Sequence, residues 1–403
     1  MKKILIISPF FKPSIGGVET HLSDVVSFLD DKNHKVFLNT YTPNITNTYR
    51  AVGEKKKNNV LLREIEGNVE IRRIRWFGNG LFFSLTDYPV LEFLYMIPAL
   101  LVYNFIFLVL HKDIKVVNPH GLIAAFVTRI LCSIFRKRSV MTVHAIYDFP
   151  KHPLLGIIAS WVFSPIAKLL VLSERGRKDL LDLGVRNEKI SISTQWVDQN
   201  FFKPPKDRAA LRRRLGFENK FVVIFVGKLF RTKGIEVLLQ SATFLPNDAR
   251  IAIVGSGPLE KKVVTASKSE PRVLFLGKVP NNELVDYYGS ADVFIIPSIS
   301  GGSEGGFEHE EGLARVVIES LSCGTPVIVS TTGCLPDAID DSVGRVVNPL
   351  PKDISKQILH FYNNQRELES LRKNCRSFAL KKYSKRNAMI IEQALVGNAD
   401  PIN

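Results

Sequence analysis

Short apolar runs alternate with longer amphipathic stretches along most of the chain. The runs are almost continuously apolar, which is typical of parallel strands covered by helices on both faces. They are ILIIS, KVFLNTY, VEIRRI, KVVNPH, RSVMTVH and KLLVLS in the first half, and FVVIFVG, ARIAIVG, RVLFLG, ADVFIIPS and TPVIVS in the second. This pattern predicts an α/β protein made of two doubly wound units.

The expected boundary between the two units lies near the middle of the chain. With 403 residues the chain is longer than a typical single domain, so two domains are the natural expectation. The periodic pattern is lost between Ile192 and Leu211, where Pro204-Pro205 interrupts the chain. We therefore expect an N-terminal domain over residues 1–198, a second domain over residues 199–375, and a basic, helical C-terminal segment over residues 376–403.

The composition describes an ordinary soluble protein. Hydrophobic residues make up 45% of the chain and charged residues 23%, which is enough apolar material for two cores. Four cysteines (Cys132, Cys323, Cys334 and Cys375) show no metal-ligand spacing, and a chain of this size needs no disulfides. The first apolar run is too short for the core of a signal peptide. We expect a cytoplasmic protein.

The net charge of +15 narrows the classes of partner. The part before Trp196 is the more basic, with 26 basic and 16 acidic residues. Such a charge suits a nucleic acid, an anionic membrane or a phosphorylated substrate. We find no nucleic-acid recognition motif and no aromatic ladder interleaved with arginine, so we expect a membrane surface or a phosphate group rather than nucleic acid.

The segment from Leu91 to Leu110 has one charged residue, Glu92, in twenty. Its length and hydropathy barely meet the requirement for a membrane span. Three interpretations stay open: a buried helix, a helix that contacts the membrane surface, and a span. A strand-like run that the sheet requires follows immediately, and this argues against a membrane span. The nearby basic cluster of Arg72, Arg73 and Arg75 favours contact with an anionic membrane.

Several glycine-rich loops follow expected strands. Gly16-Gly17 comes after the first strand and precedes an amphipathic helix, where backbone N–H groups and the helix dipole suit a phosphate; a tight turn without a ligand is the alternative. Gly255, Gly257 and Gly277 follow two later strands, but the third glycine of a dinucleotide fingerprint is missing.

Charged groups stand at the ends of strands in the second half. Lys228 and Lys233 lie on one loop, where two cations can neutralise a diphosphate; a solvated basic loop is the alternative. Glu311 belongs to a flexible loop and Glu319 to the helix that follows it, and the first N–H groups of that helix suit a phosphate. His120 and His144 lie at strand ends in the first half, although a lone histidine is more often structural.

These motifs and their order resemble those of retaining glycosyltransferases of family 4, which have the GT-B fold. The resemblance rests on the GG loop, TVH, GKL followed by KG, GSGP, two glutamates separated by seven residues, and CGTPVI, and it covers most of the chain. It implies two Rossmann-like domains that face a central cleft, with the last helix crossing back onto the N-terminal domain.

The resemblance also implies a function. It implies transfer of a sugar, with retention, from a nucleotide diphosphate-sugar to an acceptor hydroxyl by front-face displacement. No Asp-x-Asp metal motif follows an expected strand, so we expect Lys228, Lys233 and helix dipoles to replace a metal ion, and we expect no cofactor. A lipid-linked glycan at the cytoplasmic membrane face is the acceptor we expect. The implied catalytic residues are His144, Glu311, Lys228 and Lys233. The implied donor-binding residues are Gly16, Gly17, Gly255, Gly257, Gly277, Gly312, Leu313, Arg315 and Glu319.

The chain departs from the family pattern at several points. Lys228 replaces the usual arginine, Trp196 replaces a glycine at the linker, and Cys334 and Asp337 alter a loop expected to contact the sugar. The acidic insertion before Gly312 is expected to act as a lid. These departures keep two alternatives open: a GT-B epimerase or phosphorylase, and a sugar-binding scaffold that has lost its activity.

Overall fold

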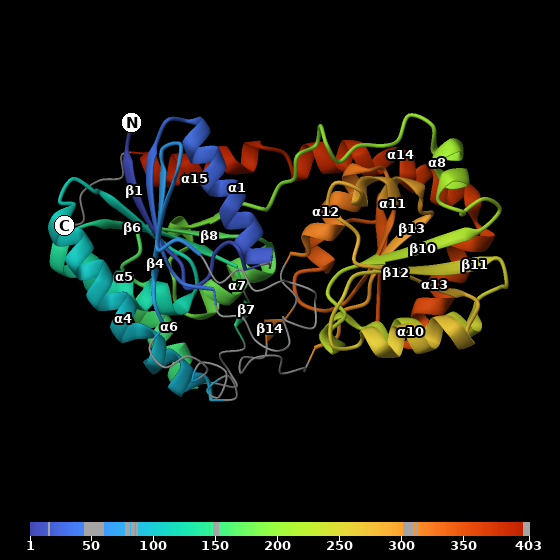
Figure 1. Cartoon of the computed structure of the whole chain (residues 1–403), viewed down its shortest axis with the longest axis horizontal. Helices are drawn as coiled ribbons and strands as arrows, with labels where there is room; N and C mark the ends of the chain where they lie inside the picture. The colour runs from blue at the N-terminus through green and yellow to red at the C-terminus, as the bar shows by residue number, and fades with distance from the viewer. Residues whose placement is uncertain are drawn as a thin grey trace.

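The computed structural model describes residues 1–14, 17–43, 60–76, 81, 85, 88–144, 146–147, 153–300, 309–310 and 313–397. Two parallel sheets, each covered by helices, lie side by side with a gap between them (Figure 1). This arrangement confirms the two doubly wound units predicted from the alternating pattern.

The N-terminal sheet has eight strands in the order β3-β4-β2-β1-β5-β6-β8-β9. All neighbours are parallel except β3 and β4. The strands are β1 (Lys3–Ile7), β2 (Lys35–Tyr41), β3 (Arg63–Glu66), β4 (Val69–Ile74), β5 (Val116–Pro119), β6 (Arg138–Val143), β8 (Lys168–Val171) and β9 (Ile190–Ile192). The helices are α1 (Gly17–Asp31), α4 (Pro89–Leu110), α5 (Leu122–Phe135), α6 (Pro153–Phe163) and α7 (Glu174–Asp182), with the 3-10 turn η2 (Asn187–Lys189).

The C-terminal sheet has six parallel strands in the order β12-β11-β10-β13-β15-β16. They are β10 (Phe221–Val226), β11 (Ala249–Val254), β12 (Val273–Gly277), β13 (Val293–Ile296), β15 (Val327–Ser330) and β16 (Gly344–Val347). The helices are α8 (Arg208–Arg214), α9 (Ile235–Ser241), α10 (Glu260–Ser269), α11 (Leu284–Ser290), α12 (Arg315–Ser322), α13 (Pro351–Asn363), α14 (Gln365–Lys382) and α15 (Arg386–Val396), with the 3-10 turns η3 (Arg231–Lys233), η4 (Ala242–Phe244) and η5 (Pro336–Ala338).

The last two helices connect the domains. Helix α14 packs on the C-terminal core through an apolar stripe that includes Leu368, Leu371 and Cys375. The chain bends after Tyr383, and α15 then packs on α1 and the N-terminal sheet through Ile391 and Leu395. The two helices run along one edge of the molecule, above the gap between the sheets (Figure 1). The domain limits expected at residues 198 and 375 stay predictions.

A two-stranded antiparallel ladder also joins the two domains. Strand β7 (Ile146–Tyr147) follows β6 in the N-terminal domain, and β14 (His309–Glu310) precedes α12 in the C-terminal domain. Their backbones pair with His309 opposite Tyr147. Most of the acidic insertion that we expect to act as a lid lies outside the described residues, but its last described residues make this contact across the gap.

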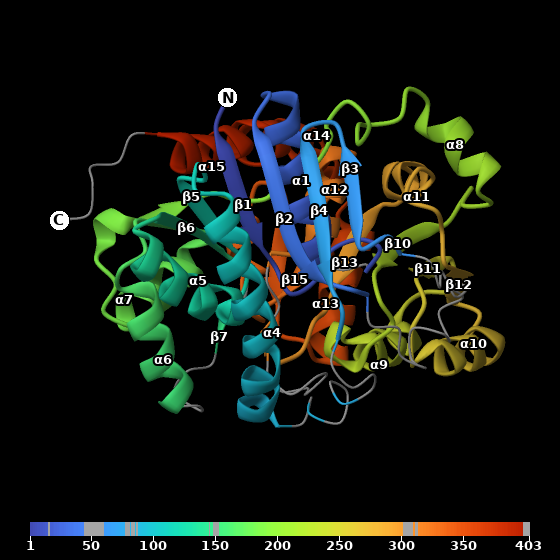
Figure 2. The same cartoon turned by 60° about the vertical axis from the view of Figure 1, so that its left-hand side comes forward.

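Helix α4 is apolar on both of its faces. It is the one described helix that is long and apolar enough to cross a membrane, and 39% of its apolar window is buried. Met96, Leu100 and Leu108 are completely buried against the N-terminal sheet and α5. The opposite face is exposed, so the structure combines a core helix with an apolar surface. Figure 2 shows α4 beside α5.

Candidate functional site

Two histidines meet at the carboxyl ends of neighbouring strands in the N-terminal domain. His120 follows β5 and His144 follows β6, and parallel strands bring these ends to the same edge of the sheet. His120 Nδ1 lies 2.8 Å from His144 Nε2, and His120 Nε2 lies 2.8 Å from Asn118 Oδ1. The two residues that we expected separately from the sequence therefore form one hydrogen-bonded chain.

The direction of these hydrogen bonds can be deduced from the last acceptor in the chain. The Val140 carbonyl can only accept, so the Asn118 amide nitrogen donates to it at 2.6 Å, and the Asn118 oxygen accepts from His120 Nε2. In a neutral His120, Nδ1 is then the acceptor, and His144 Nε2 must donate to it. A neutral His144 is therefore left with an unprotonated Nδ1, which has no partner in the described part of the chain. This nitrogen is therefore able to accept a hydrogen bond, although it is enclosed and unused in the described part of the chain.

A third histidine, His21, packs against this pair from α1. Its ring centroid lies 5.2 Å from that of His144 and 5.1 Å from that of Trp196. His21 is fully buried, and neither ring nitrogen has a hydrogen-bond partner among the described residues. His21 was not among the site residues predicted from the sequence. Its position one turn after Gly17, on the inward face of an amphipathic helix, was the available signal.

Burial keeps all three histidines uncharged at neutral pH. It lowers the pKa of His144 to about 4, and it lowers the pKa of His120 well below the ordinary 6.5, with a further contribution from the charge of His144. For His21 the causes of the lowered pKa are burial first, then the charges of His144 and Arg315. The cluster therefore offers lone pairs and neutral N–H groups rather than positive charge.

The buried histidines should make the folded protein less stable at mildly acidic pH. Between pH 6.5 and about 4 the unfolded chain binds more protons than the folded one, so the free energy of unfolding falls as the pH falls through this window. His21→Leu removes one such group without removing a described hydrogen bond. We expect the variant to lose less stability than the wild type between pH 7 and pH 5, measured by urea unfolding. Equal losses in the two proteins would contradict this account.

Three loops of the C-terminal domain are joined where β10, β11 and β12 end. Gly227 N–H donates to the Val254 carbonyl at 3.0 Å, and Gly255 N–H donates to the Gly277 carbonyl at 2.8 Å. A Cβ atom at Gly255 would lie 1.8 Å from the Gly227 carbonyl oxygen, so only glycine allows this approach. The contact places Lys228 beside the loop that carries Gly257.

Lys233 is held on a turn at the same edge of the sheet. It is the last residue of η3, which ends at Gly234 with a φ of +70°. A Cβ atom at Gly234 would lie 1.9 Å from the Pro297 carbonyl oxygen, and Ile299 N–H donates to the Thr232 carbonyl at 2.9 Å. The turn is therefore fixed against the loop after β13. Lys228 and Lys233 lie at one edge, as expected for a pair that neutralises a diphosphate.

The first turn of α12 faces the other domain. Arg315 forms an ion pair with Asp24 of α1 and lies 3.3 Å from Glu319. Glu319 is 8% exposed, and its second carboxylate oxygen accepts a hydrogen bond from the Tyr288 hydroxyl at 2.8 Å. Burial raises the pKa of Asp24 and of Glu319, although Arg315 opposes both shifts. Both oxygens of Glu319 are thus already engaged by protein groups.

The altered loop after β15 also contacts the N-terminal domain. Cys334 Sγ lies 2.9 Å from the Ser173 hydroxyl, which also accepts a hydrogen bond from Gly176 N–H at the start of α7. The Asp337 carboxylate accepts from the backbone N–H of Arg175 at 2.9 Å. The two residues that depart from the family pattern therefore contribute an interdomain contact.

Among the expected site residues of the C-terminal domain, Arg315 contacts the other domain, and Lys228, Lys233 and the loop glycines follow strands of one sheet. The expected donor-binding residue Leu313 is buried in the C-terminal core, immediately before α12. A Cβ atom at Gly17 would meet no atom within 4 Å, which leaves space above the start of α1. Gly16, Glu311 and Gly312 lie outside the described residues. The roles of all the expected site residues stay predictions.

A metal centre has no candidate in the described part of the chain. No three histidine, cysteine, aspartate or glutamate side chains there are grouped so that they could hold a metal ion. All four cysteines are free thiols.

Two family descriptions match successive parts of the chain. Residues 15–201 match "Glycosyltransferase Family 4", and residues 207–378 match "Glycosyl transferases group 1". A relative from Saccharomyces cerevisiae, the GPI3 subunit of phosphatidylinositol N-acetylglucosaminyltransferase, is 22% identical over 84% of this chain and 70% of its own length. A D-inositol 3-phosphate glycosyltransferase from Mycobacterium sp. strain KMS is 32% identical over 49% of this chain and 44% of its own.

Solved structures of two proteins share the fold. The Anabaena protein HepE in complex with UDP has a TM-score of 0.75 at 18% identity, over 99% of this chain and 100% of that one. Sucrose-phosphate synthase from Thermosynechococcus elongatus has a TM-score of 0.76 at 18% identity, over 98% of each chain. These likenesses confirm the expected fold of two parallel-sheet domains.

Proposed function

Because the chain belongs to the group 1, family 4 glycosyltransferases, which are retaining enzymes with nucleotide-sugar donors, we propose that it transfers a hexosyl group from a UDP-sugar to a hydroxyl group of a lipid-borne acceptor. The observation that carries the proposal is the meeting of α1 and α12 through Asp24 and Arg315. This contact brings α1, the helix that follows the GG loop in the sequence, against the first turn of α12. UDP-glucose is the first donor to test, since the Anabaena neighbour has been solved with it.

The proposed reaction assigns separate tasks to the two domains. Lys228 and Lys233 neutralise the diphosphate as its oxygen separates from the anomeric carbon. The acceptor oxygen forms its bond to that carbon on the same face, and the acceptor proton passes to the departing diphosphate oxygen. In this scheme the groups that enclose the unprotonated Nδ1 of His144 move aside when the donor binds, and Nδ1 accepts a hydrogen bond from a hydroxyl of the donor sugar. No metal takes part in this scheme.

A panel of nucleotide-sugars tests the donor side. Purified protein in EDTA is incubated with each donor, with and without an acceptor glycolipid, and the products are identified with the anomeric configuration of the new bond. We expect one donor to be consumed, with transfer and retention. Release of an epimerised donor, or phosphorolysis, would favour the epimerase or phosphorylase alternative. Absence of binding to every donor would favour the scaffold.

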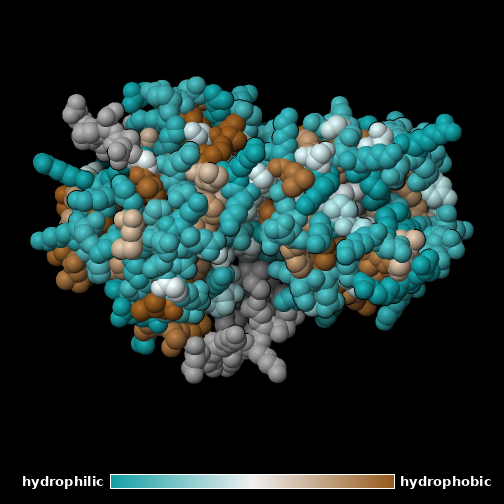
Figure 3. All heavy atoms as spheres, turned by 90° about the horizontal axis from the view of Figure 1, so that it is seen from above, coloured by the Kyte–Doolittle hydropathy of each residue, from teal (hydrophilic) through white to brown (hydrophobic). Residues whose placement is uncertain are grey.

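The exposed face of α4 supports a lipid-borne acceptor. Its exposed apolar side chains recur at helical spacing along the whole helix: Val90, Leu91, Leu94, Val102, Phe105, Ile106, Val109 and Leu110. Glu92, the only charged residue of the helix, is 8% exposed, so this face is uncharged. Apolar side chains gather at the end of the molecule where the N-terminal domain lies (Figure 3). An uncovered apolar face of this length suits a membrane surface.

Neighbouring helices extend this surface and add positive charge. Trp161 and Ile157 of α6 are 47% and 69% exposed, and the Arg129 guanidinium lies 5.0 Å from the Trp161 ring centroid. Lys137 donates to the Lys112 carbonyl at 2.7 Å, which places two cations together at the end of α4. Apolar side chains beside cations are typical of proteins that bind anionic bilayers. Four free thiols are consistent with the cytoplasmic face.

Vesicle flotation tests the membrane surface. We expect the wild type to float with phosphatidylglycerol-containing vesicles at low salt, and Leu94→Asp/Ile106→Asp to reduce the floated fraction about tenfold, since two charges enter the apolar face. Phe244→Asp/Leu350→Asp is the matched control, because these residues are exposed apolar side chains of the other domain. A wild type that stays in solution, or a control that loses as much, would contradict the membrane proposal.

A further inference from the structure

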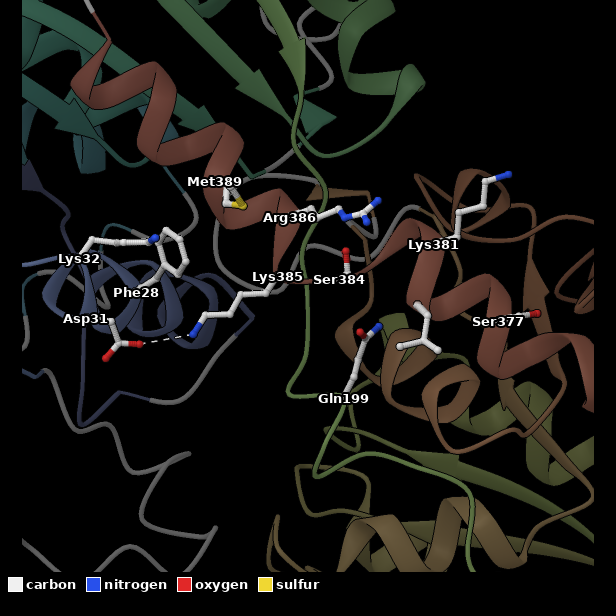
Figure 4. Close-up of a pocket in the computed structure, with 11 residues that line it drawn as sticks. Phe28, Asp31, Lys32, Gln199, Ser377, Lys381, Ser384, Lys385, Arg386 and Met389 are labelled. Carbon is white, nitrogen blue, oxygen red and sulfur yellow. Dashed lines mark hydrogen bonds and ion pairs between the residues drawn. The ribbon is translucent and has the colours of Figure 1, made fainter.

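A groove of about 870 Å³ lies where the end of α1 meets the bend between α14 and α15. Residues of both domains and of the linker line it (Figure 4). They are Phe28, Asp31, Lys32, Gln199, Ser377, Leu380, Lys381, Ser384, Lys385, Arg386 and Met389. Its volume is in the range of small-molecule sites. None of these residues belongs to the candidate donor site.

The lining of the groove is strongly basic. It contains four cations and one carboxylate, and that carboxylate, Asp31, lies 3.4 Å from the ammonium of Lys385. The side chains of Lys381 and Arg386 form no hydrogen bond or ion pair with any described residue, and both residues are exposed. Like charges held together without counter-ions repel one another, so an anion in the groove relieves this repulsion.

The shape of the groove places polar and apolar contacts side by side. The first turn of α15, from Arg386 to Met389, lines it and adds the positive end of an eleven-residue helix. The hydroxyl group of Ser384 lies between the lysines Lys385 and Lys381, where it can bond to a phosphate, and Ser377 lines the groove beyond Lys381 (Figure 4). The ring of Phe28 and the side chain of Met389 supply an apolar wall.

The groove also lies where elements of the two domains meet. Lys32 belongs to α1 of the N-terminal domain and Lys381 to α14, which packs on the C-terminal domain. Gln199 of the linker donates to the carbonyls of Ala379 and Tyr383 at 2.8 and 3.2 Å, which fixes the bend. An anion that contacts Lys32 and Lys381 together would connect the two domains.

We propose that this groove binds a small molecule that carries a chain of phosphate groups. A single phosphate brings a charge of about −2, whereas four cations and one carboxylate leave an excess of three positive charges. A polyphosphate chain matches this excess better. In Figures 1 and 2, α14 and α15 run along the top of the molecule and α4 descends toward the bottom, so a bilayer on α4 leaves the groove open to solution. The inference does not depend on the proposed transfer reaction.

Isothermal titration of the full-length chain with inorganic tripolyphosphate tests the site, and ATP in a second arm shows whether a nucleoside adds affinity. We expect binding to the wild type that weakens at least tenfold in Lys381→Gln/Arg386→Gln. Arg366→Gln/Lys373→Gln is the matched control, since it removes the same charges from exposed positions of α14. We expect the control, and Lys233→Ala in the donor site, to bind as the wild type does.

Three outcomes would overturn the proposal. The wild type binds no tripolyphosphate, the control loses as much affinity as the groove variant, or Lys233→Ala abolishes binding that the groove variant keeps. The first outcome excludes the site, the second indicates a general effect of net charge, and the third assigns the anion to the donor site. Since the two altered side chains form no described hydrogen bond or ion pair, the groove variant should keep the melting temperature of the wild type.

Discussion

Replacing Lys233 by alanine should lower kcat/KM for sugar transfer by two to three orders of magnitude. The negative charge on the diphosphate grows as its bond to the sugar breaks, and a fixed cation stabilises that charge more in the transition state than in the bound donor. Removing one such preorganised group typically costs about 10²–10³ in rate. Gly234 and the Ile299–Thr232 hydrogen bond fix the turn that carries Lys233, so little reorganisation is needed.

Steady-state kinetics with the donor identified in the panel measures this effect. We expect most of the loss in kcat, because the interaction strengthens in the transition state. Lys233→Arg should recover part of the rate, since the charge returns with a different shape. Lys268→Ala, an exposed lysine on α10, should behave as the wild type does. A loss below tenfold in Lys233→Ala would remove Lys233 from the proposed mechanism.

The second large effect is expected at Arg315, where we expect Arg315→Gln to lower the free energy of unfolding by about 2 to 4 kcal/mol. This single guanidinium lies between two largely buried carboxylates, Asp24 and Glu319. Removing one partner of a buried ion pair leaves an uncompensated charge and typically costs about 3–5 kcal/mol. The expected cost is lower here because Asp24 keeps partial contact with solvent.

A double variant separates this explanation from a simple loss of packing. Arg315→Gln/Asp24→Asn removes the unpaired charge of Asp24, so it should be more stable than Arg315→Gln alone. Burial already raises the pKa of Asp24 and of Glu319, so between their unfolded and folded pKa values the folded protein binds more protons than the unfolded chain, and it gains stability as the pH falls through that range. The deficit of Arg315→Gln should consequently be smaller at pH 5 than at pH 7, by urea unfolding. A deficit that is independent of pH, without rescue by Asp24→Asn, would contradict the electrostatic account.

The Asp24–Arg315 pair also affects how Arg315 could reach a donor. A diphosphate placed beside Arg315 would lie close to two carboxylates and be repelled by them. Arg315 can therefore serve as a diphosphate contact only after Asp24 moves away or takes up a proton. For the same reason Asp24→Asn should lower the KM for the donor, while Arg315→Gln should raise it.

The long apolar strands were readable from the sequence, and the short exposed ones were not. Runs such as FVVIFVG coincide with strands that are buried on both faces. Strand β3 was missed because three of its four residues are exposed, so its sequence REIE carries no apolar run. Strand β16 was not predicted for a similar reason, because only one of its four residues is fully buried. An edge strand is stabilised by pairing with the adjacent strand, so its own sequence need not carry an apolar pattern.

Only those residues of the candidate site that lie within short sequence motifs could be predicted. Lys228, Lys233 and His144 lie within local sequence patterns, and the structure places them at the expected strand ends. His21, Tyr288 and Asp24 were missed because their importance comes from contacts with residues far away in the sequence. Tyr288 meets Glu319 through a hydrogen bond that no local pattern encodes.

Three of the residues that depart from the family pattern, Trp196, Cys334 and Asp337, make packing or hydrogen-bond contacts within the protein. Trp196 is 6% exposed and packs in the N-terminal core beside His21. Cys334 and Asp337 contact the start of α7. Burial raises the pKa of the Cys334 thiol to about 11, so it stays protonated as a hydrogen-bonding group.

The return of α15 to the N-terminal domain has a consequence for synthesis on the ribosome. Ala388, Ile391 and Leu395 complete the core that α1 begins, although more than 350 residues separate the two helices. The first domain to leave the ribosome therefore cannot close until almost the whole chain has been made. During that interval Leu22 and Val25 lack their covering helix, and the nascent N-terminal domain presents an apolar surface to chaperones. The C-terminal domain, whose core lies within a continuous stretch of chain, can fold first.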